Sequence, residues 1–234
     1  MAMMPMLDAF NHASNAETTC AYDGERNAFV LTTNAPLQRG QEATLCYGAK
    51  SNDELLQLFG FVEANNPHDA FLSIGLDDFL LAPTSALFGS PAAAQSRYSR
   101  LVKLGLEGAL LGELRSTGAP VEMLQALRLL FASKEELEKE LPRLAKPLSL
   151  ETEERVWAAL RGYCKMARAA MGGPRKADEA AASRAAREGA PRRALALSFR
   201  AEKKRLLSEL ENRLALQASR SRKAGKVVSL IAQR

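Results

Sequence analysis

The spacing of hydrophobic residues changes along the chain. Up to about Phe71 the apolar residues form brief β-branched or aromatic runs, at 27–33 and 42–47, and these runs are separated by the turn residues Asn34, Pro36 and Gly40. Such runs predict short strands. Beyond about Gln95 the apolar residues recur with a period near 3.6, which predicts helices. The whole pattern predicts an α+β protein with a small β-rich first part and an all-α second part.

Capping residues mark where two of the helices begin. Ser51 and Glu54 have the spacing of a capping box and predict a short helix that ends near Gly60. Ser133 and Glu136 have the same spacing and predict a second helix start.

The region between the two parts is less regular. Its prolines, Pro67, Pro83 and Pro91, predict a loop-rich passage. Helical spacing follows in Leu101, Leu104, Leu110, Leu111 and Leu114, so we expect the helical pattern to run through these leucines.

Three further segments complete the helical part. Residues 151–171 predict a long helix, after Pro142 and Pro147 close the preceding one. Residues 177–190 are Ala, Arg, Glu and Ser with almost no large apolar side chain, so we expect a mobile loop there in preference to a weakly anchored helix. Residues 193–219 place their leucines on one stripe and predict a last helix.

The composition narrows the class of protein. The 234 residues are 47% hydrophobic and 25% charged, as in an ordinary globular protein, and no apolar run approaches the ~20 residues of a membrane span. The cysteines Cys20, Cys46 and Cys164 are scattered and odd in number, which argues against a disulfide framework or a thiolate zinc site. We expect reduced thiols and an intracellular protein without a metal.

The net charge of +5 comes from Arg and Lys after Gly173. These cations raise the possibility of phosphate contacts. However, Glu202, Glu209 and Glu211 lie among them, and such mixing is typical of a solvated helix face with i,i+4 pairs. The charge pattern therefore argues against nucleic acid as a partner, and the adjacent acids Asp77 and Asp78 are expected on the solvated surface.

Four short motifs follow one another in the β-rich part. They are Leu-Asp-Ala-Phe-Asn-His-Ala-Ser-Asn at 7–15, Leu-Gln-Arg-Gly-Gln-Glu at 37–42, Tyr-Gly-Ala-Lys-Ser-Asn at 47–52 and Phe-Gly-Phe-Val-Glu at 59–63. In this order they resemble the back half of the SET domain in the Rubisco large-subunit methyltransferase branch. The helical remainder resembles the substrate-binding domain that follows SET in that branch.

The resemblance implies a division of the chain. Residues 1–71 would be the C-terminal part of a SET domain, and residues 72–234 the helical substrate-binding domain with a basic tail. The front half of a family member, with its glycine-containing cofactor loop, is missing, so we expect a truncated catalytic domain.

The resemblance also assigns the site. Asn11 and His12 match residues that lie against S-adenosylmethionine, and Tyr47 matches the tyrosine that faces the transferring methyl group. Without the motifs, His12 would be interpreted as a buried histidine that binds loop carbonyls, and Tyr47 as a core aromatic with its hydroxyl at the rim.

Phe59 departs from the family pattern, because plastid members carry a second tyrosine there that lines the lysine channel. Relatives that act on histidine also differ at this position. Lysine is the expected target, and histidine stays open.

Two functions from different classes follow. The first is an S-adenosylmethionine-dependent protein-lysine N-methyltransferase, in which the helical domain docks the protein substrate. The second is a non-catalytic protein-interaction module that retains only the docking helices.

Overall fold

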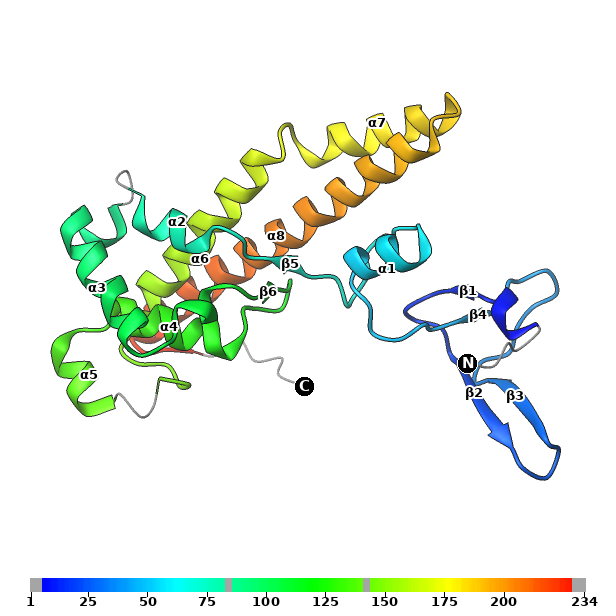
Figure 1. Ribbon diagram of the computed structural model, residues 1–234, viewed down its shortest axis with the longest axis horizontal. Helices are drawn as coiled ribbons and strands as arrows, with labels where there is room; N and C mark the ends of the chain where they lie inside the picture. Colours follow the sequence, from blue (N-terminus) through cyan, green and yellow to red (C-terminus); the bar gives the residue numbers. More distant parts are fainter. Residues whose placement is uncertain (1–5, 83–85, 141–143, 229–234) are drawn as a thin grey trace. The chain divides into compact units, whose positions relative to one another are not determined.

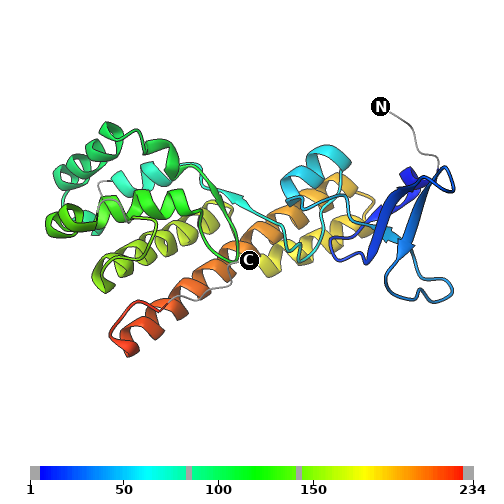
Figure 2. The ribbon, with the colours of Figure 1, turned by 90° about the horizontal axis from the view of Figure 1, so that it is seen from below.

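The computed structural model describes residues 6–82, 86–140 and 144–228 (Figures 1 and 2). The chain divides into two compact units, residues 1–69 and residues 70–234. Unit 1 carries the elements η1 Leu7–Ala9, β1 Asn11–His12, β2 Thr18–Asp23, β3 Ala28–Thr33, β4 Thr44–Leu45 and α1 Asn52–Phe59.

A β-hairpin accounts for most of the strand structure in unit 1. Strands β2 and β3 are antiparallel, with Thr18 opposite Thr33. The connecting turn is held by Asp23, whose Oδ1 accepts hydrogen bonds from the backbone N–H groups of Glu25 at 2.9 Å and Arg26 at 3.1 Å. This local pattern is typical of Asp at the start of a turn. The strand predicted at 27–33 is confirmed as β3, whereas its partner β2 was not predicted.

Strands β1 and β4 form a second, parallel pair, with Asn11 beside Thr44 and His12 beside Leu45. The run at 42–47 is therefore a strand only at its centre. The predicted helix after it is α1, which has the full capping box of Ser51 and Glu54 and ends at Gly60 in the left-handed conformation. The β1–β4 pair brings the segment before the hairpin next to the segment after it.

Unit 1 buries few apolar side chains. Leu55 is its one buried apolar residue in the range 6–69, and the other buried residues of that range are the polar Ser51, Asn52, Asn66 and Asp69. A domain normally stabilises itself by burying apolar surface. Unit 1 therefore depends on hydrogen bonds among its polar side chains.

Unit 2 is helical and has the larger core. Its elements are β5 Phe71–Leu72, α2 Leu76–Leu81, η2 Ala86–Phe88, α3 Pro91–Lys103, η3 Glu107–Leu110, β6 Glu113–Leu114, α4 Val121–Phe131, α5 Lys134–Glu140, α6 Leu150–Ala170, α7 Arg175–Arg187 and α8 Pro191–Ala224. The helices predicted at 151–171 and 193–219 are confirmed as α6 and α8. Ser133 and Glu136 cap the start of α5 reciprocally, as predicted. Pro142 lies outside the described residues.

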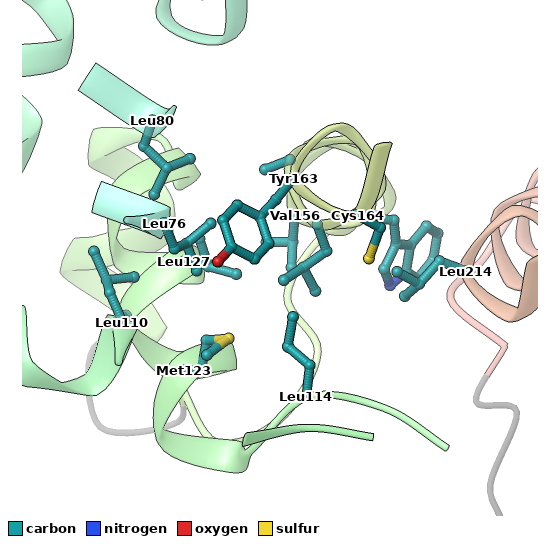
Figure 3. Close-up of a cluster of buried hydrophobic side chains, with 14 of the residues drawn as sticks. Leu76, Leu80, Leu110, Leu114, Met123, Leu127, Val156, Tyr163, Cys164 and Leu214 are labelled. Carbon is teal, nitrogen blue, oxygen red and sulfur yellow. The ribbon is translucent and has the colours of Figure 1, made fainter. Parts of the chain in front are cut away.

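The core of unit 2 forms around α6, which packs against α4 and α8. Figure 3 shows the Tyr163 ring among Leu76, Leu127 and Val156, and Cys164 on the side of α6 toward Leu214 of α8. The Tyr163 hydroxyl donates to the Ile74 carbonyl at 2.6 Å, so its polar end is satisfied. Burial, the Cys164 thiol and the Asp77 carboxylate raise the pKa of Tyr163 to about 12.

A buried ion pair joins α4 to α6. Arg128 donates to Glu153 through Nε at 2.6 Å and Nη2 at 3.1 Å, and both side chains are buried. Arg128 also donates to the Leu144 carbonyl at 2.9 Å, and Glu153 accepts from the backbone N–H of Leu148 at 3.2 Å. The pair therefore fixes both helices and the segment that precedes α6.

The prediction of an uninterrupted helical pattern through Leu104 to Leu114 is wrong. Helix α3 ends at Lys103, because Gly105 adopts a left-handed φ of 65° that stops the helix. The chain then forms η3 and β6, and β6 pairs with β5. The loop-rich passage before it also contains α2, so Asp77 and Asp78 lie in the first turn of a helix.

The prediction of a loop at 177–190 is wrong as well. Helix α7 covers most of this segment and packs along α8, as the paired helices in Figure 1 show. Its buried residues are Asp178, Ala182 and Ala185. Alanine lets two helices approach closely, so large apolar side chains are not needed to anchor this one.

Asp178 attaches α7 to α8. Its Oδ2 accepts from the Lys204 ammonium at 2.6 Å, and its Oδ1 accepts from Arg200. Lys204 is itself buried and also donates to the carbonyls of Gly172 and Gly173. Burial favours the neutral acid, but the hydrogen bonds from Arg200 and Lys204 outweigh burial and hold the pKa of Asp178 below its usual range.

Asp178→Asn should lower the free energy of unfolding of the helical unit by about 3 kcal/mol, because it leaves the Lys204 charge buried without its carboxylate. Since the folded pKa is lowered, this contribution is complete above the unfolded pKa of about 3.9 and is lost as pH falls through the folded pKa. Urea unfolding followed by circular dichroism at several pH values measures both effects.

Glu179→Gln is the matched control, because Glu179 forms an exposed pair with Arg175 on the same helix. Losing this exposed ion pair should lower the free energy of unfolding by less than about 1 kcal/mol. Equal destabilisation by the two substitutions would contradict the role given to Asp178.

Candidate active site

The structure brings the predicted site residues His12 and Tyr47 together in unit 1, whereas Asn11 adjoins His12 along the chain and its side chain contacts Glu42. Strand β1 carries Asn11 and His12, and Tyr47 follows β4, the strand that pairs with β1. The rings of His12 and Tyr47 have centroids 5.0 Å apart. Parallel pairing thus joins residues that are more than thirty positions apart in sequence.

The side chain of His12 is buried, although its backbone is partly exposed, and both of its ring nitrogens have partners. Its side chain is 0% exposed. Nδ1 accepts a hydrogen bond from the backbone N–H of Tyr47 at 3.0 Å. In a neutral ring, Nε2 then carries the hydrogen, and it lies 3.2 Å from Ser14 Oγ and 3.5 Å from Glu63 Oε2. His12 therefore fixes the backbone of Tyr47 rather than projecting into an open space.

The hydrogen-bond chain continues from His12 to α1. Ser14 donates through Oγ to Glu63 Oε2 at 2.5 Å and through its backbone N–H to Glu63 Oε1 at 2.8 Å. The Asn52 side-chain amide binds both backbone groups of Glu63. It accepts a hydrogen bond from the Glu63 N–H at 2.9 Å and donates one to the Glu63 carbonyl at 3.0 Å. The backbone N–H of Asn52 in turn donates to Asp69 Oδ1 at 2.9 Å.

Sequence reasoning gave no role to Ser14, Glu63 or Asn52. Their only signal was their place inside or beside the four motifs, because hydrogen bonds that span 49 residues leave no local pattern. In the structure they connect His12 to the first turn of α1, so the backbone position of Tyr47 depends on them.

The Tyr47 hydroxyl has a defined direction. It donates to the Phe10 carbonyl at 2.5 Å, which leaves its lone pairs available to another group. Its ring lies 4.9 Å from that of Phe59. Phe61 adds a further ring, 5.7 Å from His12. The result is a cluster of aromatic side chains with two oxygen atoms at one edge.

Phe59, at the edge of this cluster, and Asn11 are both exposed. Phe59 is 46% exposed, so its ring is available to a ligand. The Asn11 amide donates to Glu42 Oε1 at 2.5 Å. The cofactor role of Asn11 and His12, the catalytic role of Tyr47 and the channel role of Phe59 stay predictions.

Two oxygen atoms, the Tyr47 hydroxyl and the Phe10 carbonyl, lie together beside the aromatic rings. Within the described ranges no group of three His, Cys, Asp or Glu side chains is placed to hold a metal. The oxygens of Tyr47 and Phe10 beside aromatic rings suit one wall of a site for a methylsulfonium compound. In the same ranges, the helices all fall short of the length or apolar character needed to cross a bilayer.

Comparison with known proteins identifies the relationship. Residues 92–207 match the protein family described as Rubisco LSMT substrate-binding. SET domain-containing protein 4 of Mus musculus is 33% identical over 67 residues, which are 29% of this chain and 15% of the mouse protein. Ribosomal lysine N-methyltransferase set11 of Schizosaccharomyces pombe is 32% identical over 80 residues, 34% of this chain and 20% of the yeast protein. This chain is related to SET-domain methyltransferases of the Rubisco LSMT type.

Solved structures agree with this LSMT-type relationship at the level of the fold. The structure of Rubisco LSMT bound to AdoMet aligns with 97% of this chain and 55% of its own, with a TM-score of 0.53 and 20% identity. Rubisco LSMT bound to sinefungin and monomethyllysine gives a TM-score of 0.53 with 21% identity. The chain thus spans about half the length of Rubisco LSMT and less of the SET-domain relatives.

Two substitutions at His12 test the link to Tyr47 in this chain. His12→Asn keeps an acceptor near the position of Nδ1, whereas His12→Gln moves the amide toward the position of Nε2. We expect the Tyr47 amide hydrogen to exchange about three- to tenfold faster in His12→Gln and nearly at the original rate in His12→Asn, because one net hydrogen bond is lost only in the former. Site-resolved hydrogen exchange by NMR measures this.

Glu42→Gln serves as the control, because its partner Asn11 lies next to His12 but outside the chain of hydrogen bonds. If both His12 variants changed Tyr47 exchange equally, the Nδ1 contact would not be what holds Tyr47.

Proposed function

We propose that this chain is the C-terminal part of an S-adenosylmethionine-dependent protein-lysine N-methyltransferase. In this proposal residues 1–71 are the C-terminal part of a SET domain, and residues 72–234 form the helical domain that docks the protein substrate. The sequence match of the helical region to a substrate-binding family supports the second assignment. The similar structures hold AdoMet, AdoHcy or sinefungin, which supports the choice of cofactor.

One observation carries the proposal for unit 1. Tyr47 is held at both ends, by His12 at its backbone and by the Phe10 carbonyl at its hydroxyl. The cofactor would supply a methyl group on a positively charged sulfur. Methyl transfer to a neutral amine needs alignment and oxygen dipoles near the reacting carbon more than proton chemistry. A hydroxyl whose hydrogen is already donated to Phe10 presents its lone pairs for that purpose.

A lysine target agrees with the names of the relatives. Set11 is named a ribosomal lysine N-methyltransferase, and similar Rubisco LSMT structures hold lysine, methyllysine or monomethyllysine. The half-exposed Phe59 ring would contact the aliphatic part of a lysine side chain. A phenylalanine there offers no hydroxyl to the amine, so histidine stays as the alternative target.

The second candidate is a non-catalytic protein-interaction module. The uneven core favours it: unit 2 buries a large set of apolar side chains, whereas the described part of unit 1 buries only Leu55 among its apolar residues. A helical unit with its own core can fold and bind without a working catalytic site.

Cofactor binding distinguishes the candidates. Unit 1 offers one wall of a pocket. Binding a ligand loses translational and rotational freedom, which costs an estimated 4–15 kcal/mol, and contacts with one wall must offset this loss. We expect this 234-residue chain to bind S-adenosylmethionine weakly or not at all, and a protein that also carries the N-terminal half of a SET domain to bind it and methylate a protein lysine. Calorimetric titration of both proteins, with a methyl-incorporation assay, measures the difference. Tight binding by the 234-residue chain would contradict the one-wall assignment.

Tyr47→Phe tests the chemistry in the longer protein. We expect turnover to fall by about 100-fold or more, a typical cost of removing a preorganised polar group, with cofactor affinity nearly unchanged. Tyr22→Phe is the matched control, because Tyr22 lies on the hairpin and donates to Asn27 Oδ1. Full activity in Tyr47→Phe would remove this residue from the mechanism.

A further inference from the structure

A groove of about 730 Å³ lies on unit 2, where the end of α3 meets α4 and α5. It is lined by Arg100, Lys103, Leu104, Leu129, Lys134, Leu137 and Glu138. All of these positions fall within the segment that matches the substrate-binding family. None of them belongs to the site around Tyr47, which lies in unit 1.

The floor of the groove is apolar. Leu129 is buried, Leu137 is half-buried and Leu104 is 50% exposed. Leu104 follows directly after the end of α3, so its side chain stays at the surface instead of entering the core. Isolated exposed leucines are common, but three leucines lining one depression offer a place for apolar side chains of a partner.

The rim is positively charged. Arg100, Lys103 and Lys134 line the groove together with a single acidic residue, Glu138. Among the residues that the structure describes, none of these three cations is paired with a carboxylate. The positive field extends further along α3: burial, Arg155 and Arg100 together lower the pKa of Arg97.

We propose that this groove binds an acidic, amphipathic segment of the protein substrate, with apolar side chains on Leu104, Leu129 and Leu137 and carboxylates against Arg100, Lys103 and Lys134. That the segment belongs to the methylated protein rests on the proposed function. An acidic helix with leucines three or four residues apart has this chemistry. Unpaired cations around an apolar floor attract such a segment and orient it.

Single-stranded nucleic acid is the other polyanion that a basic rim could attract. It is bound mainly by cations together with aromatic rings that stack on bases. The groove is lined by leucines and has no aromatic side chain among its lining residues. An acidic peptide therefore fits the groove better.

The test measures binding to the chain itself. The probe is a fluorescein-labelled peptide of about four helical turns, with Leu at every third or fourth position and Glu between them. Fluorescence anisotropy should show binding that weakens as salt rises. Lys103→Glu combined with Lys134→Glu should weaken it about tenfold, a loss of about 1.4 kcal/mol. Leu104→Glu should weaken it by a similar factor.

Lys176→Glu with Lys223→Glu is the matched control, because both lysines are exposed, lie outside the groove and give the same change of net charge. It should leave binding unchanged, and unchanged circular dichroism in all variants confirms their fold. A probe with Ser in place of Leu should also bind weakly. Equal affinity for the groove and control variants would overturn the proposal, as would a labelled oligonucleotide that binds through the same residues in place of the peptide.

The longer protein separates this inference from the proposed function. If both hold, the groove variants raise KM for a protein substrate and leave kcat unchanged. If no variant transfers methyl groups while peptide binding still depends on the groove, the proposed function fails and the groove remains a docking site.

Discussion

The packing of α6 against its neighbours is the contact on which the helical unit depends. Val156, Leu160 and Tyr163 of α6 are fully buried or nearly so. At Gly162 an added Cβ would lie 2.8 Å from the Phe79 ring, so this side chain of α2 packs directly on the α6 backbone and would have to shift for any larger residue. Interiors packed this closely are rigid. The helices that carry the docking groove are therefore held in fixed positions by a core that needs no ligand.

Unit 1 is stabilised differently, and this difference shapes its function. Its residues are connected by a chain of hydrogen bonds from Tyr47 through His12, Ser14 and Glu63 to Asn52. Each hydrogen bond contributes only about 0.5–1.5 kcal/mol net, and the one buried leucine in the described part of unit 1, Leu55, about 1.5–3 kcal/mol. Such a network can set the position of a tyrosine with precision. It is a weak base for independent folding, which agrees with the proposal that unit 1 is one part of a larger catalytic domain.

The sequence predicted the elements whose signals are local. The capping box at Ser51 and the long apolar stripe of α6 were both sufficient to locate helices. Helix α7 was missed because its contact with α8 is made by small alanines and the Asp178–Lys204 pair, which leave no periodic pattern of large apolar residues. The candidate active site was also predicted only in part. The motifs indicated Tyr47 and His12, but the hydrogen-bond partners of His12 come close to it only when the chain folds.

Hydrogen exchange along the whole chain tests the central claim, that the helical unit is stabilised by its own apolar core whereas unit 1 depends on a network of hydrogen bonds. Mass spectrometry should find slow exchange in α4, α6 and α8 and fast exchange in β1 and β4. When the N-terminal half of a SET domain and S-adenosylmethionine are both present, β1 and β4 should become slow as well. Protection of β1 and β4 equal to that of α6 in this chain alone would contradict the account.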